Sequence, residues 1–277
     1  MQRRHRIEGG GGLALNVLEW GPADGVPLFL IHGWSQAYAC WEKQYASPLA
    51  DEFRVVAMDL RGHGNSAAPA TQAAYTDGRL WADDVKAVID ALDLRRPVLA
   101  GWSYGGLVIC DYLRHHGEQA LGGVNFVGAA VRLGEIAFGK LIGNGFIEPF
   151  PHATSEDLAE SIDGIRDFVM RCFHRKLSRT DYERALCFNM TARADVRASL
   201  AARQLDNVDV LAKLRLPVLI TQGRLDNMVL PPMAELIKSQ VPHADLSWYD
   251  DVGHGPFMED PERFNRELAA FARATRQ

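Results

Sequence analysis

The chain has 277 residues, of which 47% are hydrophobic and 23% charged, and its formal net charge is −5. These values are ordinary for a soluble globular protein, and the slight acidity argues against nucleic acid as the main partner. No apolar run approaches the ~20 residues of a membrane-spanning helix, and no apolar segment follows the basic residues 3–6 as it would in an export signal. We therefore expect a cytoplasmic protein that binds neither nucleic acid nor a membrane.

The four cysteines, Cys40, Cys110, Cys172 and Cys187, form no C-x-x-C pair and have no histidine partners at metal-binding spacing. Each lies in an apolar stretch, so buried reduced thiols are expected, in keeping with a cytoplasmic location. The sequence has no P-loop, and the glycines at 62 and 64 lack the third glycine of a dinucleotide motif. We expect neither a metal nor a cofactor.

The first half of the chain alternates strands with helices. Residues 6–20 read as an edge hairpin about the glycine run 9–12. Apolar residues that recur every three or four positions over residues 79–92 predict an amphipathic helix. Short apolar runs predict buried strands at 27–31, 53–58, 97–100 and 124–130. Such alternation specifies a mostly parallel sheet with helices on both faces.

The alternation stops between residues 132 and 209, where we find no strand. A capping box is expected at Thr154 to Asp157, before a helix with one apolar face, and further helices near 181–190 and 194–205. Strands resume at 216–221 and 246–249, which makes eight, and a helix over 261–273 closes the chain. We predict an α/β core of residues 1–131 and 210–277, with residues 132–209 as a helical cap over one sheet edge.

The motif G-x-S-x-G occupies residues 101–105, between a predicted buried strand and an almost wholly apolar helix. In this setting it predicts a nucleophile elbow, in which a strained turn lifts the hydroxyl of Ser103 clear of the sheet. The glycines on either side are expected to avoid collisions with neighbouring backbone. Ser103 is therefore the candidate nucleophile.

A serine hydroxyl needs a base, and the base needs an orienting partner. His254 lies between two glycines just beyond the last predicted strand, and an imidazole titrates in the range that proton shuttling requires. Asp226 follows the strand at 216–221. Its rivals, Asp250 and Asp251, are so near His254 in sequence that they would have to fold back onto the ring. We therefore predict a triad in the chain order Ser103, Asp226, His254.

An acyl-transfer site also needs donors for the developing oxyanion. We expect the backbone N–H groups of Tyr104, directly after the serine, and of Trp34, in the loop after the strand 27–31. Trp34 is also a candidate wall of the pocket. His32 and the polar glycine-rich segment 59–66 are expected to hold loops in place rather than to contact substrate.

Five segments together resemble the α/β-hydrolase superfamily: LIHGW (30–34), DLRGHGNS (59–66), GWSYGG (101–106), the turn at Asp226, and DVGHGPF (251–257). The likeness covers nearly the whole chain and looks closest to a bacterial branch of cofactor-free haloperoxidase or perhydrolase-like esterases, arylesterases and enol-lactonases. The resemblance implies a serine hydrolase that cleaves carboxylic esters or lactones, with side perhydrolysis of small acids. Epoxide hydrolases and haloalkane dehalogenases of this fold place an aspartate where this chain has Ser103, so their mechanism is excluded.

Two other functions stay open on sequence. One is a C–C bond hydrolase or lyase acting on a keto substrate, which would need basic cap residues such as Arg166, Arg171 or Arg175 near the serine. The other is a ligand-binding receptor that kept the fold without turnover. Aromatic residues hint at an apolar pocket for a small to medium substrate, and the candidates for contacting it are Trp34, Phe138, Phe146 and Phe257, with Phe168 and Phe173 also in the cap. The oligomeric state is not indicated.

Overall fold

A computed structural model of the protein describes residues 2–275. Its central feature is an eight-stranded sheet in the order β1-β2-β4-β3-β5-β6-β9-β10. The strands β1 and β2 pair antiparallel, as do β2 and β4, and all other neighbours are parallel. The strands are β1 (Arg3–Glu8), β2 (Ala14–Trp20), β3 (Pro27–Ile31), β4 (Arg54–Met58), β5 (Val98–Trp102), β6 (Gly123–Val127), β9 (Val218–Gly223) and β10 (Asp245–Tyr249). The prediction of a mostly parallel eight-stranded sheet with an edge hairpin is confirmed.

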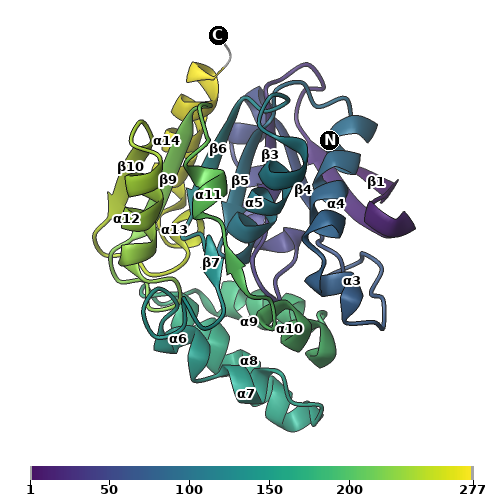
Figure 1. Ribbon diagram of the computed structural model, residues 1–277, viewed down its shortest axis with the longest axis vertical. Coiled ribbons are helices and arrows are strands. Elements are labelled where there is room, and N and C mark those ends of the chain that lie inside the picture. The colour runs from purple at the N-terminus through teal and green to yellow at the C-terminus, as the bar shows by residue number, and fades with distance from the viewer. Residues whose placement is uncertain (1, 276–277) are drawn as a thin grey trace.

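Helices cover both faces of this sheet (Figure 1). Successive strand side chains point to opposite faces, so Phe29 and Ile31 pack in one core and Leu28 and Leu30 in the other. The first core is covered by α3 (Ala73–Thr76), α4 (Gly78–Ala91), α5 (Tyr104–His116), α11 (Val208–Leu211) and α12 (Pro231–Gln240). The short 3₁₀ helix η1 (Gly10–Gly12) contacts α4. The second is covered by η2 (Tyr38–Trp41), α1 (Glu42–Tyr45), α2 (Leu49–Glu52), α13 (Pro256–Glu259) and α14 (Pro261–Ala274).

Between β6 and β9 the chain carries α11 and five other helices, and these five lie together at the lower end of Figure 1. They are α6 (Asn144–Ile147), α7 (Phe150–Ala153), α8 (Leu158–Cys172), α9 (Arg179–Asn189) and α10 (Ala194–Ala201). The expectation that this segment has no strand was wrong. The strands β7 (Arg132–Leu133) and β8 (Leu205–Asp206) pair antiparallel at its base, and two residues are too few to show a strand periodicity. We call residues 132–209 the cap, and the boundary at these residues stays a prediction.

Three local expectations were also wrong. The N-cap of α8 is Asp157, whose carboxylate accepts a hydrogen bond from the Glu160 N–H at 2.9 Å, whereas Thr154 ends α7 by donating to the Phe150 carbonyl. The strand β6 stops at residue 127 because Gly128 takes a positive φ of 47°. Cys187 is exposed on α9, while the other three cysteines are buried as expected.

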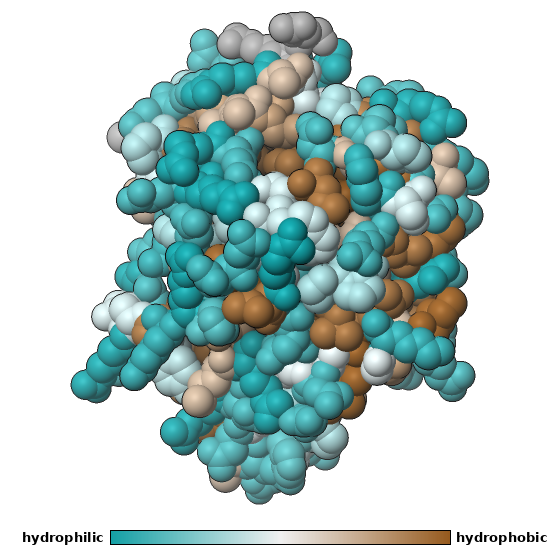
Figure 2. Space-filling model, turned by 90° about the vertical axis from the view of Figure 1, so that its left-hand side faces the viewer, coloured by the Kyte–Doolittle hydropathy of each residue, from teal (hydrophilic) through white to brown (hydrophobic). Residues whose placement is uncertain are grey.

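The face shown in Figure 2 is mostly hydrophilic, and its apolar residues form separate patches. Among residues 2–275, the large apolar side chains that are exposed are Ile136, Leu158, Met170 and Leu225. None of the helices in this part of the chain combines the length and apolar character that a bilayer crossing demands.

Candidate active site

Ser103 lies at the junction of β5 and α5, in a strained backbone conformation. Its φ of 56° and ψ of −116° are far from the regions that residues with a Cβ favour. Neighbouring glycines permit this tight turn. A Cβ on Gly101 would lie 2.7 Å from the Gly105 carbonyl oxygen, and one on Gly105 would lie 2.6 Å from the Ile31 carbonyl oxygen. This is the geometry expected of a nucleophile elbow, and strain of this kind concentrates at functional sites.

Asp226 and His254 form a buried hydrogen-bonded pair on the loops after β9 and β10. The His254 Nδ1 lies 2.8 Å from the Asp226 Oδ2. Because a carboxylate only accepts, Nδ1 carries a proton, and the neutral form of the ring then has its lone pair on Nε2. Oδ2 also accepts from Gln222 Nε2 at 3.0 Å. Oδ1 accepts from the backbone N–H groups of Met228 at 2.8 Å and Val229 at 3.0 Å. The aspartate is thus fixed on both oxygens, whereas its rival Asp250 is exposed and pairs with Arg224.

The structure brings this pair next to the serine. The indole N–H of Trp102, the residue before Ser103, donates to the His254 carbonyl at 2.8 Å, and the two rings lie 5.4 Å apart. The Ser103 N–H donates to the carbonyl of Val127 at 3.0 Å. A Cβ on the next residue, Gly128, would lie 3.2 Å from His254 Nδ1 and 3.3 Å from the Asp226 carboxylate. The three predicted catalytic residues therefore converge on the loop that follows β6.

The two predicted oxyanion donors flank the serine. Tyr104 is the first residue of α5, where backbone N–H groups have no acceptor within the helix. Trp34 follows Gly33, and a Cβ on that glycine would lie 3.0 Å from the Ser103 Cβ and 3.6 Å from its Oγ. Within residues 2–275, neither the Trp34 nor the Tyr104 backbone N–H has a hydrogen-bond acceptor. Both donors are free to bind an oxygen of a ligand beside Ser103.

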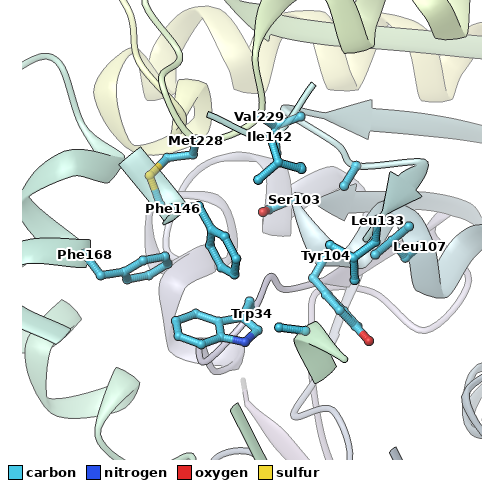
Figure 3. A pocket seen from close by; sticks show the side chains of 12 residues that line it. Trp34, Ser103, Tyr104, Leu107, Leu133, Ile142, Phe146, Phe168, Met228 and Val229 are labelled. Atoms are coloured by element: carbon cyan, nitrogen blue, oxygen red, sulfur yellow. The ribbon is translucent and has the colours of Figure 1, made fainter. Parts of the chain in front are cut away.

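Ser103 opens into an apolar pocket. In Figure 3 its hydroxyl points into the middle of the surrounding side chains. The polar ends of Trp34 and Tyr104 point away from it and bond to the backbone of α10. Apart from Ser103, the pocket is lined by Trp34, Tyr104, Leu107, Ala130, Leu133, Ile142, Phe146, Phe168, Ala201, Met228 and Val229. Ser103 thus provides the polar side chain that this lining offers to a ligand, next to the backbone N–H groups of Trp34 and Tyr104.

Of the four candidates for substrate contact, Trp34 and Phe146 line the pocket and two do not. Phe138 stacks behind Phe146, with ring centroids 6.5 Å apart. Phe257 belongs to the core on the other face of the sheet, where it packs between Trp41 and Trp102, with ring centroids 4.2 and 4.8 Å away. Both rings pack against the hydrophobic cores and neither lines the pocket, so their assignment as substrate-contacting residues is corrected.

Several lining residues were missed by sequence reasoning. Met228 and Val229 directly follow the Asp226 turn, and Leu107 lies one helical turn after Ser103, so their positions relative to the catalytic residues could have indicated them. Of the other two cap aromatic residues, Phe168 lines the pocket, whereas Phe173 packs against the backbone at Gly255.

The three cap arginines that a C–C bond hydrolase would need do not reach the pocket. Arg166 is exposed beside Asp163, and Arg171 pairs with Asp167 and Glu148. The Arg175 guanidinium donates to backbone carbonyls at residues 251 and 259. None of them lines the cavity beside Ser103.

His32 supports the loop that carries Trp34, as expected. Its Nδ1 donates to the Gly33 carbonyl at 2.8 Å, and its Nε2 accepts from the Leu60 N–H at 3.0 Å. Burial holds the pKa of His32 well below its usual value, so the ring stays neutral and keeps both bonds. Asp59, in the same support, accepts from the backbone N–H groups of Tyr38 and Asn65.

Glu259 is a buried residue that sequence reasoning missed. Its Oε1 accepts from the N–H groups of Gly253 and Gly255, on either side of His254. Its Oε2 accepts from the N–H groups of His174 and Arg175, just after α8. Burial raises the pKa of this carboxyl group, while the four N–H donors oppose the rise. The histidine loop is bound to the cap a second time, because the His254 N–H donates to the Cys172 carbonyl at 2.8 Å.

Proteins of similar sequence and structure include esterases and related enzymes. A protein described as an aryl esterase from Burkholderia cenocepacia has a solved structure that superimposes with a TM-score of 0.93, at 35% identity over 99% of both chains. A bifunctional esterase/perhydrolase from Acinetobacter calcoaceticus is 28% identical over 95% of this chain and 97% of its own. A non-heme chloroperoxidase from Streptomyces lividans is 28% identical over 92% of this chain and 95% of its own.

The sequence profile of one family matches residues 28–267, which include β3 from its second residue onward, the serine elbow, the Asp226 turn and the His254 loop. The same stretch contains the cap. The chain therefore belongs to the alpha/beta hydrolase family.

Proposed function

We propose that the protein is a serine hydrolase that cleaves carboxylic ester or lactone bonds through an acyl-enzyme intermediate. The observation that carries the proposal is the hydrogen-bonded His254–Asp226 pair beside a strained serine whose hydroxyl faces an apolar pocket. The aryl esterase described above, which is 35% identical over nearly the whole chain, supports ester bonds as the target.

Each group has a role in this mechanism. The Ser103 oxygen attacks the substrate carbonyl carbon while His254 Nε2 takes its proton, and Asp226 holds the imidazole in the required tautomer and stabilises its charged form. The backbone N–H groups of Trp34 and Tyr104 bind the carbonyl oxygen as it becomes negative. The protonated His254 then gives its proton to the leaving alcohol. Water then attacks the acyl carbon while His254 Nε2 takes its proton. The bond to the Ser103 oxygen breaks, that oxygen takes the proton from His254, and the acid is released.

The pocket lining favours an uncharged, apolar substrate of small to medium size. Trp34 and Tyr104 use their polar atoms elsewhere, so a charged group in the pocket would be buried without a partner. Hydrogen peroxide can replace water in the second step, in which case the acyl group leaves as a peracid. The similarity to an esterase/perhydrolase supports this side reaction.

An activated fluorophosphonate tests the nucleophile. We expect one covalent adduct per chain, on the peptide that contains Ser103, and loss of p-nitrophenyl butyrate hydrolysis in proportion to labelling, because the adduct occupies the attacking oxygen. Mass spectrometry locates the adduct. Hydrolysis that persists after Ser103 is fully labelled would contradict the proposal. Turnover of ring-cleavage diketones without turnover of simple esters would point instead to C–C bond hydrolysis.

Glu259→Gln is expected to weaken both the fold and the catalysis. One carboxylate oxygen becomes an NH₂ group facing two backbone N–H donors, so the free energy of unfolding should fall by about 1–3 kcal/mol. The loop of His254 also loses support, and kcat should fall by about tenfold or more. Denaturant titration and ester kinetics measure the two effects. Glu262→Gln, on the exposed first turn of α14, should change neither. An unchanged kcat for Glu259→Gln would show that Glu259 does not position the histidine.

A further inference from the structure

The side chains of both oxyanion-hole residues are bonded to the same turn of one cap helix. The Trp34 indole N–H donates to the Arg197 carbonyl at 2.9 Å, and the Tyr104 hydroxyl donates to the Leu200 carbonyl at 3.3 Å. Residues 197 and 200 are neighbours on one face of α10. Trp34 and Tyr104 follow different strands, β3 and β5, so the cap helix is their common support.

The Tyr104 hydroxyl is also held from a second side. Arg203, just after α10, donates to the phenol oxygen through Nη1 at 3.3 Å. Its Nη2 donates to both carboxylate oxygens of Asp111, at 2.8 and 2.9 Å, and both side chains are almost completely buried. Trp81 closes the third side, with its ring centroid 5.7 Å from that of Tyr104 and 5.9 Å from the Arg203 guanidinium. The phenol oxygen thus joins α10, the linker after it, and α5.

This support bears on catalysis because the Tyr104 backbone carries a donor that must meet the oxyanion at hydrogen-bond distance. Such donors contribute only when they are held in place before the reaction, and a displacement of about 1 Å can cost about 100-fold in rate. A buried ion pair adds little net stability over apolar side chains of similar volume. The Arg203–Asp111 pair is therefore better explained by its holding the Tyr104 hydroxyl in position than by a contribution to stability alone.

We propose that Tyr104 through its hydroxyl, and Arg203 and Asp111 through Tyr104, are positioning residues that couple the cap helix α10 to the oxyanion hole. The inference rests on the proposed function, since it assigns a role within the same acyl-transfer site. It gives the cap a part in transition-state binding besides lining the pocket. It also assigns a function to an ion pair that does not contact the pocket.

Tyr104→Phe tests this directly, because it removes the phenol oxygen and keeps the ring and the backbone N–H. We expect kcat to fall about 10- to 100-fold with KM within twofold of the parent value. Affinity for a trifluoromethyl ketone, which forms an oxyanion on Ser103, should fall by the same factor as kcat/KM. Affinity for a methyl-ester analogue whose ester oxygen is replaced by CH₂ should stay unchanged. The matched control is Tyr112→Phe, a buried tyrosine about two turns along α5 whose hydroxyl makes no bond to α10, and it should keep full activity.

A second variant tests whether the Arg203–Asp111 ion pair affects kcat through the Tyr104 hydroxyl. Asp111→Leu with Arg203→Met removes both charges together, so no buried charge is left alone. We expect its kcat to match that of Tyr104→Phe, and the triple variant to show no further loss. Losses that multiply would mean that the ion pair acts independently of the phenol, and would overturn its assignment. Should the double variant not fold, Tyr104→Phe alone decides.

The outcomes separate this inference from the proposed function. A parent protein that neither hydrolyses esters nor takes a phosphonate on Ser103 would refute the proposed function, and this inference with it. A parent protein that does both, together with a Tyr104→Phe variant of unchanged kcat and unchanged ketone affinity, would refute the coupling of α10 to the oxyanion hole alone.

Discussion

Ser103→Ala and His254→Ala are each expected to lower kcat for p-nitrophenyl butyrate by about 10⁵- to 10⁶-fold, and the double variant should lose no more than either alone. Each change disables the same step, since alanine at 103 removes the nucleophile and alanine at 254 removes the base that activates it. Because Ser103 and the His254–Asp226 pair converge on one loop, we expect them to act as a unit. Some rate above the uncatalysed reaction should remain, because the pocket and the oxyanion donors are unaltered.

Steady-state kinetics with active-site titration of the parent protein measure these losses. Two exposed residues provide matched controls, Ser239→Ala at the end of α12 and His152→Ala on α7, and both variants should keep full activity. If the losses of the two single variants multiplied in the double variant, the serine and the histidine would act in separate steps. The assignment of a shared proton transfer would then be wrong.

The residues of the site differ in how far the sequence alone indicates them. Ser103 and His254 lie between glycines just after strands, and the chain direction takes both to the same sheet edge. The position of Asp226 after β9 also indicates it, because parallel strands place their following loops together. These three assignments depend on local glycines and on the order of the strands along the chain, and the strand order seen in the sheet agrees with the predicted one.

The residues that sequence did not indicate depend on contacts between distant segments. Glu259 lies in a short helix like any surface glutamate. Two of its donors, Gly253 and Gly255, are local, and only the approach of the segment after α8 adds the other two, His174 and Arg175. The aromatic residues of the cap look alike in sequence but take different positions in the fold. Phe168 lines the pocket, whereas Phe138 stacks with the ring of Phe146 and does not line it. Helix periodicity identifies an apolar face, but the partner of that face is decided by the tertiary fold.

Asp226→Asn is expected to lower kcat by about 10⁴-fold. It should also lower the free energy of unfolding by about 1–3 kcal/mol, because an NH₂ group at the position of Oδ2 faces the Gln222 Nε2 donor. The reason lies in the bonds of the two carboxylate oxygens. Oδ1 accepts from two backbone N–H groups, those of Met228 and Val229, so an asparagine must place its carbonyl oxygen there. Its NH₂ group then takes the position of Oδ2, 2.8 Å from His254 Nδ1. An NH₂ group only donates, so Nδ1 must become the acceptor and the ring proton must move to Nε2.

A histidine with its proton on Nε2 has no lone pair for the Ser103 proton, so Asp226→Asn removes the base without removing the imidazole. The rate of fluorophosphonate labelling at Ser103 should therefore fall with kcat, whereas KM stays near the parent value. Nitrogen NMR of the imidazole should report protonated Nε2 in the variant and protonated Nδ1 in the parent protein. Asp250→Asn is the matched control, because that carboxylate is exposed and, among residues 2–275, its side-chain partner is Arg224. A full loss of activity in Asp250→Asn with activity retained in Asp226→Asn would show that Asp250, and not Asp226, orients the histidine.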